Sequence, residues 1–169
     1  MVVSSVVGLF IHLVRQLTLI MCFQSLILDM AGNVGTQSLA VTIRVLMDES
    51  LTGKQKLQLV FKEMRIGFCN GLLLGVLSFA VIGLFIFLFK GKTMMFAFSV
   101  SACIGIALLL AMLISSAVGT CIPLFFKKIH IDPAVASGPL ITTVNDLVAV
   151  ITFYGLSWLF LIEMLHLAG

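Results

Sequence analysis

The chain has 169 residues, of which 61% are hydrophobic and only 10% are charged, and its formal net charge is +3. Soluble domains are about half apolar and about one-quarter charged, so this composition excludes a sizeable soluble domain and indicates an integral membrane protein. The positive charge is too small and too dispersed to indicate nucleic-acid binding. The four cysteines stand singly, which indicates neither a zinc site nor a disulfide framework.

The chain is long enough for four or five transmembrane helices in a single domain, residues 1–169, since a bilayer core of about 30 Å takes about 20 apolar residues per helix. The first apolar run, within residues 1–14, reaches only about 20 Å as a helix, so a short or partial first helix is expected there. The second membrane segment is predicted over residues 17–46. It is interrupted by glycines and polar residues, namely Asp29, Gly32, Asn33, Gly35 and Gln37.

Residues 47–65 form a predicted connector between membrane segments. Their apolar side chains recur at the i, i+3, i+4 and i+7 spacing of an amphipathic helix, at Leu57, Val60, Phe61 and Met64. We expect a short helix that lies at the cytoplasmic membrane interface.

Three further membrane segments are predicted over residues 66–89, 96–126 and 139–167. In the first of them, Gly67, Gly71 and Gly75 place small residues on one helical face, where another helix can approach closely. We interpret this face as an ordinary helix-packing surface. The segments together predict an all-α integral membrane protein with four to five transmembrane helices per subunit.

Basic residues predict the orientation, because cytoplasmic loops of membrane proteins carry an excess of lysine and arginine. Five of the ten basic residues lie at the end of the second segment and in the connector after it, namely Arg44, Lys54, Lys56, Lys62 and Arg65. This loop is therefore predicted to be cytoplasmic, together with the loop at Lys127 and Lys128. The result is a multi-pass protein of the cell (plasma) membrane with an external C-terminus.

Asp146 lies in the middle of the last apolar segment. A carboxylate in hydrocarbon costs a few kcal/mol on insertion scales, so it normally meets a cation, a proton or water. Gly138, Thr142 and Asp146 recur every four residues along one helical face, with Asn145 beside them. Oxygen ligands suit a hard cation, and Mg²⁺ fits a site with one carboxylate because it gives up its waters reluctantly. We therefore predict a metal site at Asp146, Thr142 and Gly138.

The second segment carries a polar string that is predicted to line the same pore. Irregular backbone at this depth is tolerated only against protein or water. The residues of this string are Asn33, Gly35, Thr36 and Gln37, and Asn145 joins them from the last segment. Packing between helices is the alternative interpretation and stays open. Asp29 either adds charge to the pore lining or pairs with Arg15, and both interpretations stay open as well.

A single Asp146 is a sparse site for a divalent ion. Two chains related by a two-fold axis would bring two copies of this aspartate face to face, and C₂ dimers are the commonest oligomers. The sequence thus favours a homodimer with a central pore. The alternative, in which Asp146 is protonated or hydrogen-bonded to Asn33 or Thr142 as structural glue, stays open.

Three short motifs occur in order along the chain. Residues 32–38 read Gly-Asn-Val-Gly-Thr-Gln-Ser, and residues 62–67 read Lys-Glu-Met-Arg-Ile-Gly. Asp132, Pro133 and Ala134 are followed by Pro139, Leu140 and Asp146. These strings resemble the G-N-x-G-x-Q-S, K-E-x-x-x-G and D-P-A…P-L…D elements of the MgtE family of magnesium channels and transporters.

This resemblance implies a homodimer of five-helix subunits whose second and fifth helices line a central pore, with Mg²⁺ entering down its electrochemical gradient. It also implies that Asp146 lies at the ion site, with Thr142 and Gly138 as its companions. The family often has asparagine at Gly138 and commonly has a small residue at Asp29. Family members usually carry a cytoplasmic magnesium-sensing region with CBS domains, and we expect this chain to correspond to the transmembrane domain only.

The predicted function is divalent cation (Mg²⁺) transport through a pore at the dimer interface, with the hydrated ion held by Asp146 of both subunits. Transport needs no catalysis, so neither a catalytic residue nor an organic cofactor is predicted. The expected partners are Mg²⁺, a second copy of the chain and membrane lipid. Two alternatives stay open, namely an exchanger of Mg²⁺ against H⁺ or Na⁺, and a non-transporting membrane assembly subunit.

Overall fold

The computed structural model describes residues 21–48, 51–136 and 139–159. These residues form four α-helices and one short 3₁₀ helix, and they contain no β-strand. In chain order the elements are α4 (Gln24–Asp48), α5 (Gly53–Lys90), α6 (Met94–Lys128), η1 (Pro133–Ala136) and α7 (Pro139–Ser157). The predicted all-α fold is confirmed. The predicted first helix within residues 1–14 and the end of the last segment, residues 160–167, lie outside the described residues.

Three of the described helices are long and apolar enough to cross a membrane, namely α5, α6 and the part of α7 over Leu140–Ser157. The prediction of a membrane protein built from apolar helices is thus confirmed. Helix α4, with 25 residues, is long enough but is not among the three. Its polar residues, including Asp29, Asn33 and Gln37, make it the least apolar of the four helices.

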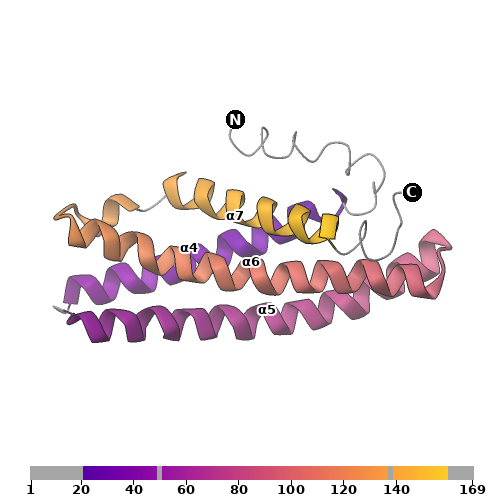
Figure 1. Cartoon of the computed structure of the whole chain (residues 1–169), viewed down its shortest axis with the longest axis horizontal. Helices are drawn as coiled ribbons and strands as arrows, with labels where there is room; N and C mark the ends of the chain where they lie inside the picture. Colours follow the sequence, from indigo (N-terminus) through magenta and orange to yellow (C-terminus); the bar gives the residue numbers. More distant parts are fainter. Residues whose placement is uncertain (1–20, 49–50, 137–138, 160–169) are drawn as a thin grey trace.

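Helix α6 is the centre of the bundle, because it packs against α4, α5 and α7, whereas α4 and α5 hardly touch. The helices extend along the length of the molecule, and in this view α6 lies between α5 and α7 while α4 crosses α6 (Figure 1). Ser38 of α4 meets Ser116 of α6, and the Lys127 Nζ donates to the backbone oxygen of Leu46, so these two helices are parallel. Helix α5 runs antiparallel to α6, as the glycine contacts below show.

Helix α5 differs from the predicted separate connector and membrane segment, since both belong to one helix of 38 residues. It begins at Thr52, whose backbone N–H donates to Gln55 Oε1 at 2.8 Å, and such a capping box stabilises a helix start. No glycine or proline interrupts residues 54–66, so the helix continues into the membrane segment. It ends at Gly91, whose φ of 59° is the left-handed conformation that glycine adopts readily.

The face of α5 that packs inside the subunit is not the apolar face of residues 47–65 that is expected at the membrane interface. Leu57 and Phe61 are 58% and 56% exposed, whereas Leu59 and Glu63 are only 8% and 2% exposed. Glu63 and Leu59 lie one and two turns before Gly67, on the same helical face. The close contact of the glycines with α6 therefore decides which side of α5 is buried, and the apolar periodicity before them does not.

The predicted glycine packing surface of α5 is confirmed. A Cβ atom added at Gly75 would lie 2.8 Å from the Gly105 backbone oxygen, and one added at Gly71 would lie 2.8 Å from Leu109 Cα. At Gly67 it would lie 2.7 Å from Ser116 Cβ. These distances are too short for any larger side chain, so the glycines allow the backbones of α5 and α6 to approach directly.

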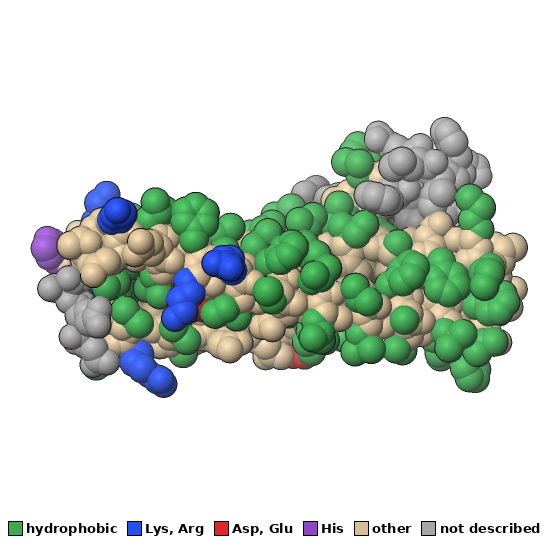
Figure 2. Space-filling model, turned by 90° about the horizontal axis from the view of Figure 1, so that it is seen from below, with side chains coloured by type: hydrophobic (Ala, Val, Ile, Leu, Met, Phe, Trp, Pro, Cys, Tyr) green, Lys and Arg blue, Asp and Glu red, His purple; other side chains and the backbone are tan. Residues whose placement is uncertain are grey.

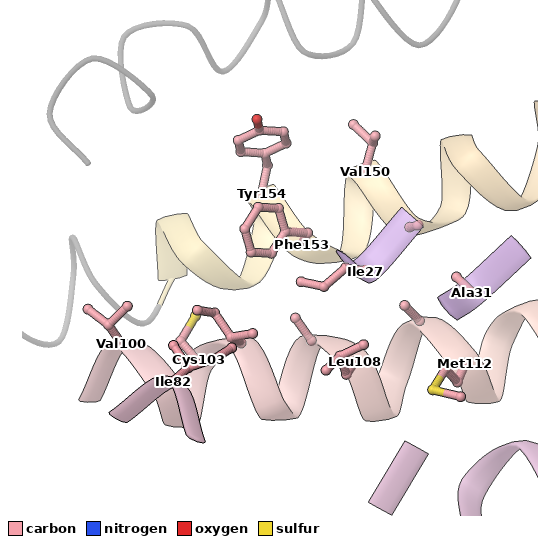
Figure 3. Close-up of a cluster of buried hydrophobic side chains, with 14 of the residues drawn as sticks. Ile27, Ala31, Ile82, Val100, Cys103, Leu108, Met112, Val150, Phe153 and Tyr154 are labelled. Carbon is pink, nitrogen blue, oxygen red and sulfur yellow. The ribbon is translucent and has the colours of Figure 1, made fainter. Parts of the chain in front are cut away.

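The apolar core lies where all four helices meet (Figure 3). It takes Ile27 and Ala31 from α4, Ile82 from α5, Leu108 and Met112 from α6, and Val150 and Phe153 from α7. Tyr154 packs beside Phe153 and directs its hydroxyl away from the cluster, where it donates to Gln24 Oε1 at 2.6 Å. This bond joins the start of α4 to the end of α7, so these two helices are antiparallel.

On the face shown in Figure 2, Lys and Arg side chains gather toward the end where α4 ends and α5 begins. The remainder of the face in view is mostly hydrophobic. The end of α6 lies at the same end as the end of α4, because Lys127 contacts Leu46. The two basic groups from which the orientation was predicted therefore lie together in the fold.

Candidate ion-binding site

A cavity of about 420 Å³ lies between α4 and α7. Its lining is polar apart from one leucine and one glycine, and consists of Ser25, Leu28, Asp29, Gly32, Asn33, Thr36, Thr142 and Asp146. Asp29, Asn33, Thr36 and Thr142 are exposed, and Asp146 is half-buried. The cavity therefore opens on the outside of the subunit and not into its core.

Helix α4 supplies six of these residues because of their helical spacing. Positions 25, 28, 29, 32, 33 and 36 follow the i, i+3, i+4 pattern that places side chains on one face of a helix. The opposite face carries the buried residues Ile27, Ala31, Val34 and Ser38. Packing of this apolar face against the core thus turns the polar face of α4 outward.

The polar groups of α4 in the cavity are partly held by one another. The Asn33 Nδ2 donates to Asp29 Oδ2 at 3.4 Å. The Thr36 hydroxyl donates to backbone oxygens of its own helix, at 2.9 Å to Gly32 and 3.0 Å to Asn33. The hydroxyl proton of Thr36 is therefore used in a hydrogen bond within α4, and the hydroxyl oxygen remains an acceptor. The predicted alternative partner of Asp29, Arg15, lies outside the described residues.

Helix α7 contributes Thr142 and Asp146, one turn apart on the same face, as their spacing predicted. Of the three predicted metal ligands, Gly138 lies outside the described residues. Asp29, Asn33 and Thr36 are the predicted pore-lining residues that lie in the cavity with Thr142 and Asp146.

Three other predicted pore-lining residues lie elsewhere. Gln37 is exposed but is not part of the lining. Gly35 and Asn145 are buried inside the subunit, and a Cβ atom added at Gly35 would lie 2.6 Å from Asn145 Cγ. Gly35 and Asn145 thus lie outside the lining of this cavity, and their place in the pore stays a prediction. Gly35 directly precedes Thr36, and Asn145 directly precedes Asp146. One position along a helix turns the direction of a side chain by about 100°, so these neighbours point elsewhere.

Two lining residues, Ser25 and Leu28, were not predicted from the sequence. Ser25 lies one turn before Asp29, and Leu28 lies one turn before Gly32. The i, i+3, i+4 spacing of the polar string, continued toward the N-terminus of α4, could have identified these positions.

A chain of buried polar groups joins α4, α5 and α6 on the inner side of α4. The Ser116 hydroxyl donates to the backbone oxygen of Glu63 at 2.5 Å, and its oxygen lies 3.1 Å from Ser38 Oγ. Glu63 is buried, and its Oε1 has no hydrogen-bond partner among the described residues. Buried polar groups of this kind fix the relative positions of helices within a membrane. The sequence analysis missed this chain, although Ser38 and Glu63 belong to the quoted motifs.

The chemistry of the cavity suits a hard, hydrated cation. Its polar atoms are carboxylate, hydroxyl and amide groups, which are the ligands that Mg²⁺ and Ca²⁺ prefer, and the described lining residues carry neither sulfur nor imidazole. Within the described residues, no group of three or more histidine, cysteine, aspartate or glutamate side chains could hold a metal ion. A water molecule takes about 30 Å³, so 420 Å³ leaves room for an ion with its waters.

Comparisons with known proteins agree with this chemistry. Residues 24–156 match the family MgtE, described as a divalent cation transporter. The chain is 32% identical over 158 residues to the magnesium transporter MgtE of Bacillus subtilis, covering 94% of this chain and 33% of that protein. The corresponding protein of Enterococcus faecalis gives the same figures. The magnesium transporter MgtE of Thermus thermophilus is 28% identical over 161 residues, or 95% of this chain and 34% of its own length. The chain thus spans about one third of the length of these relatives.

Proposed function

Since the chain belongs to the MgtE family of divalent cation transporters, we propose that it transports Mg²⁺ across a membrane through a pore formed where two copies meet. The hydrated ion is held by Asp146 of both subunits, with Thr142 and Gly138 as its companions. The observation that carries this proposal is the cavity between α4 and α7, in which two carboxylates and several neutral oxygens face out of the subunit.

The outward direction of the cavity supports the dimer. Carboxylate and amide groups in contact with hydrocarbon are costly, so a polar face on the outside of a membrane bundle has to be covered by protein or water. A second copy of the same face, related by a two-fold axis, covers it with groups of the same kind and encloses water between them. Each cavity is then one half of a central pore.

The charges in the cavity suit a divalent ion. Asp146 contributes one carboxylate per subunit, and Asp29 adds another from α4. Because Mg²⁺ keeps most of its waters in proteins, these groups act through the water shell and do not have to surround the ion directly. The cation offsets the cost of holding carboxylates at this depth.

The membrane potential is sufficient to drive uptake. A charge that crosses an inside-negative membrane gains about 2.3 kcal/mol per 100 mV, and a divalent ion gains about twice as much. Transport of this kind forms and breaks no covalent bond, so the protein is not an enzyme and needs no organic cofactor. The basic end of the bundle faces the cytoplasm, which places the C-terminus outside the plasma membrane.

Mg²⁺ flux into proteoliposomes tests the proposal. The purified chain is expected to admit Mg²⁺ under the ion gradient and voltage alone, and Asp146→Asn is expected to abolish this flux. Asp132→Asn is the matched control, since it makes the same change at an exposed aspartate between α6 and α7. Normal flux in the Asp146→Asn variant would overturn the proposal.

The same assay separates the two alternatives. An exchanger stalls when the H⁺ or Na⁺ gradient is removed, whereas a pore does not. A non-transporting assembly subunit gives no flux in any condition. Either result would contradict transport by the channel mechanism.

A further inference from the structure

Helices α4, α6 and α7 meet at one residue, Gly35. On one side, a Cβ atom added at Gly35 would lie 2.6 Å from Cγ and 2.8 Å from Oδ1 of Asn145 in α7. On the other side, a Cβ atom added at Gly119 of α6 would lie 3.0 Å from the Gly35 carbonyl carbon. The side chain of Asn145 therefore packs closely against the backbone of α4 at the point where that backbone also contacts α6.

The burial of Asn145 is unusual for an amide. Its side chain is 0% exposed, and neither Nδ2 nor Oδ1 has a hydrogen-bond partner among the described residues. Burial of unpaired polar atoms lowers stability, and each such group in a folded protein requires an explanation. Hydrogen bonding within the described part of the subunit does not supply such an explanation for Asn145. The shape of the Asn145 side chain explains its burial, because the side chain fills the space that Gly35 leaves open.

Asn145 is the residue directly before Asp146 on α7. Their side chains leave the helix about 100° apart, so one points into the bundle while the other lines the cavity. A contact that fixes the rotation of α7 at Asn145 therefore also fixes the direction of the Asp146 carboxylate. Thr142, one turn before Asp146, is aligned with it by the same rotation.

We infer that Asn145 is a positioning residue for the transported ion: its contact with Gly35 sets the rotation and depth of α7, and thereby holds Asp146 and Thr142 toward the cavity. This inference rests on the proposed function, because it concerns the ion held at Asp146. It assigns Asn145 no direct contact with the ion.

Size-swap variants test this inference. Gly35→Ala adds a methyl group that the Asn145 side chain has to avoid, and Asn145→Ala removes the amide altogether. In the double variant Gly35→Ala/Asn145→Ala, the new methyl group occupies part of the space that the amide leaves. Gly119→Ala presses on the Gly35 backbone and not on Asn145, so its effect is not relieved by Asn145→Ala. Gly155→Ala is the control on α7, since no described residue has an atom within 4 Å of a Cβ atom there.

The readouts are the Mg²⁺ dissociation constant from isothermal titration, Mg²⁺ flux, and the thermal unfolding of the same detergent-solubilised samples. Each single variant at Gly35 or Asn145 is expected to raise the dissociation constant about ten-fold or more, which corresponds to about 1.4 kcal/mol. The double variant is expected to bind Mg²⁺ more tightly than either single variant, although it has no amide. Gly155→Ala is expected to bind like the wild type.

Two results would overturn the inference. One is wild-type Mg²⁺ affinity in Asn145→Ala, which only removes atoms and therefore remains testable if Gly35→Ala does not fold. The other is a double variant whose loss of affinity is the sum of the two single losses, since independent sites add. Failure of the proposed function is recognised separately, because then Asp146→Asn itself leaves binding and flux unchanged.

Discussion

Asp29 of α4 and Asp146 of α7 line the same cavity, although they lie near opposite ends of the described chain. The antiparallel packing of the two helices brings them together, and Asn33 holds the Asp29 carboxylate by a hydrogen bond at 3.4 Å. The pair gives the cavity a negative charge at two positions along α4 and α7. A cation that enters from solution therefore meets more than one carboxylate.

Asp29→Asn is expected to weaken Mg²⁺ uptake without abolishing it. Asp29 contributes charge to the cavity but is exposed, so its interaction with the ion is of order 1 kcal/mol, or about five-fold in apparent affinity. The measurement is the Mg²⁺ concentration dependence of flux in proteoliposomes. The loss should shrink at high ionic strength, because salt screens exposed charges.

Asp29→Glu is the control for this prediction, as it keeps the charge and is expected to retain most of the affinity. An unchanged concentration dependence in Asp29→Asn would remove this residue from the ion pathway.

Gly75→Ala is expected to destabilise the contact between α5 and α6 by about 1–3 kcal/mol, the usual cost of forcing extra atoms into a packed interior. The new methyl group would lie 2.8 Å from the Gly105 backbone oxygen, and a backbone atom cannot move aside without shifting the helix. Thermal unfolding followed by circular dichroism in detergent measures the effect.

Gly53→Ala serves as the control within the same helix, because nothing lies within 4 Å of a Cβ atom at that position. It should be neutral or slightly stabilising, since alanine favours helix over glycine by up to about 1 kcal/mol. Equal melting temperatures for the two variants would show that the glycine contact does not limit stability.

Glu63→Gln is expected to leave the stability unchanged or to increase it, whereas Glu63→Ala is expected to lower it by about 2 kcal/mol or more. The side chain is buried and its Oε1 has no partner among the described residues, so glutamine keeps the volume and removes an ionisable group. Alanine instead leaves a cavity between α5 and α6.

Thermal unfolding of the two Glu63 variants is again the measurement. A loss in Glu63→Gln as large as that in Glu63→Ala would mean that a cation stabilises the carboxylate in the folded protein.

Much of the fold and part of the site follow from local patterns in the sequence. Long apolar runs predict α5, α6 and α7, because a bilayer requires about 20 apolar residues per helix. The four-residue spacing of Thr142 and Asp146 predicts that both lie on one face of α7, and in the structure both line the cavity. The glycine spacing of α5 predicts its packing surface, since close backbone contact requires small residues.

Rotation of the helices could not be read from the same patterns. Asn145 and Gly35 are polar or small neighbours of cavity residues, and only the contacts of α7 and α4 with the core turn them inward. The buried face of α5 at Leu59 and Glu63 was not predicted for a related reason. The apolar periodicity at Leu57 and Phe61 predicts a face at the membrane interface, whereas the contacts of the glycines with α6, which is distant in sequence, decide which face is buried.

The stoichiometry of Mg²⁺ binding tests the shared site most directly. Isothermal titration of the purified chain, combined with the mass of its detergent complex, gives the number of ions per chain and the number of chains per complex. The account predicts a dimer with one Asp146-dependent ion for every two chains, and the loss of that ion in Asp146→Asn with the dimer intact. One Asp146-dependent ion in every single chain, or unchanged binding in Asp146→Asn, would contradict it.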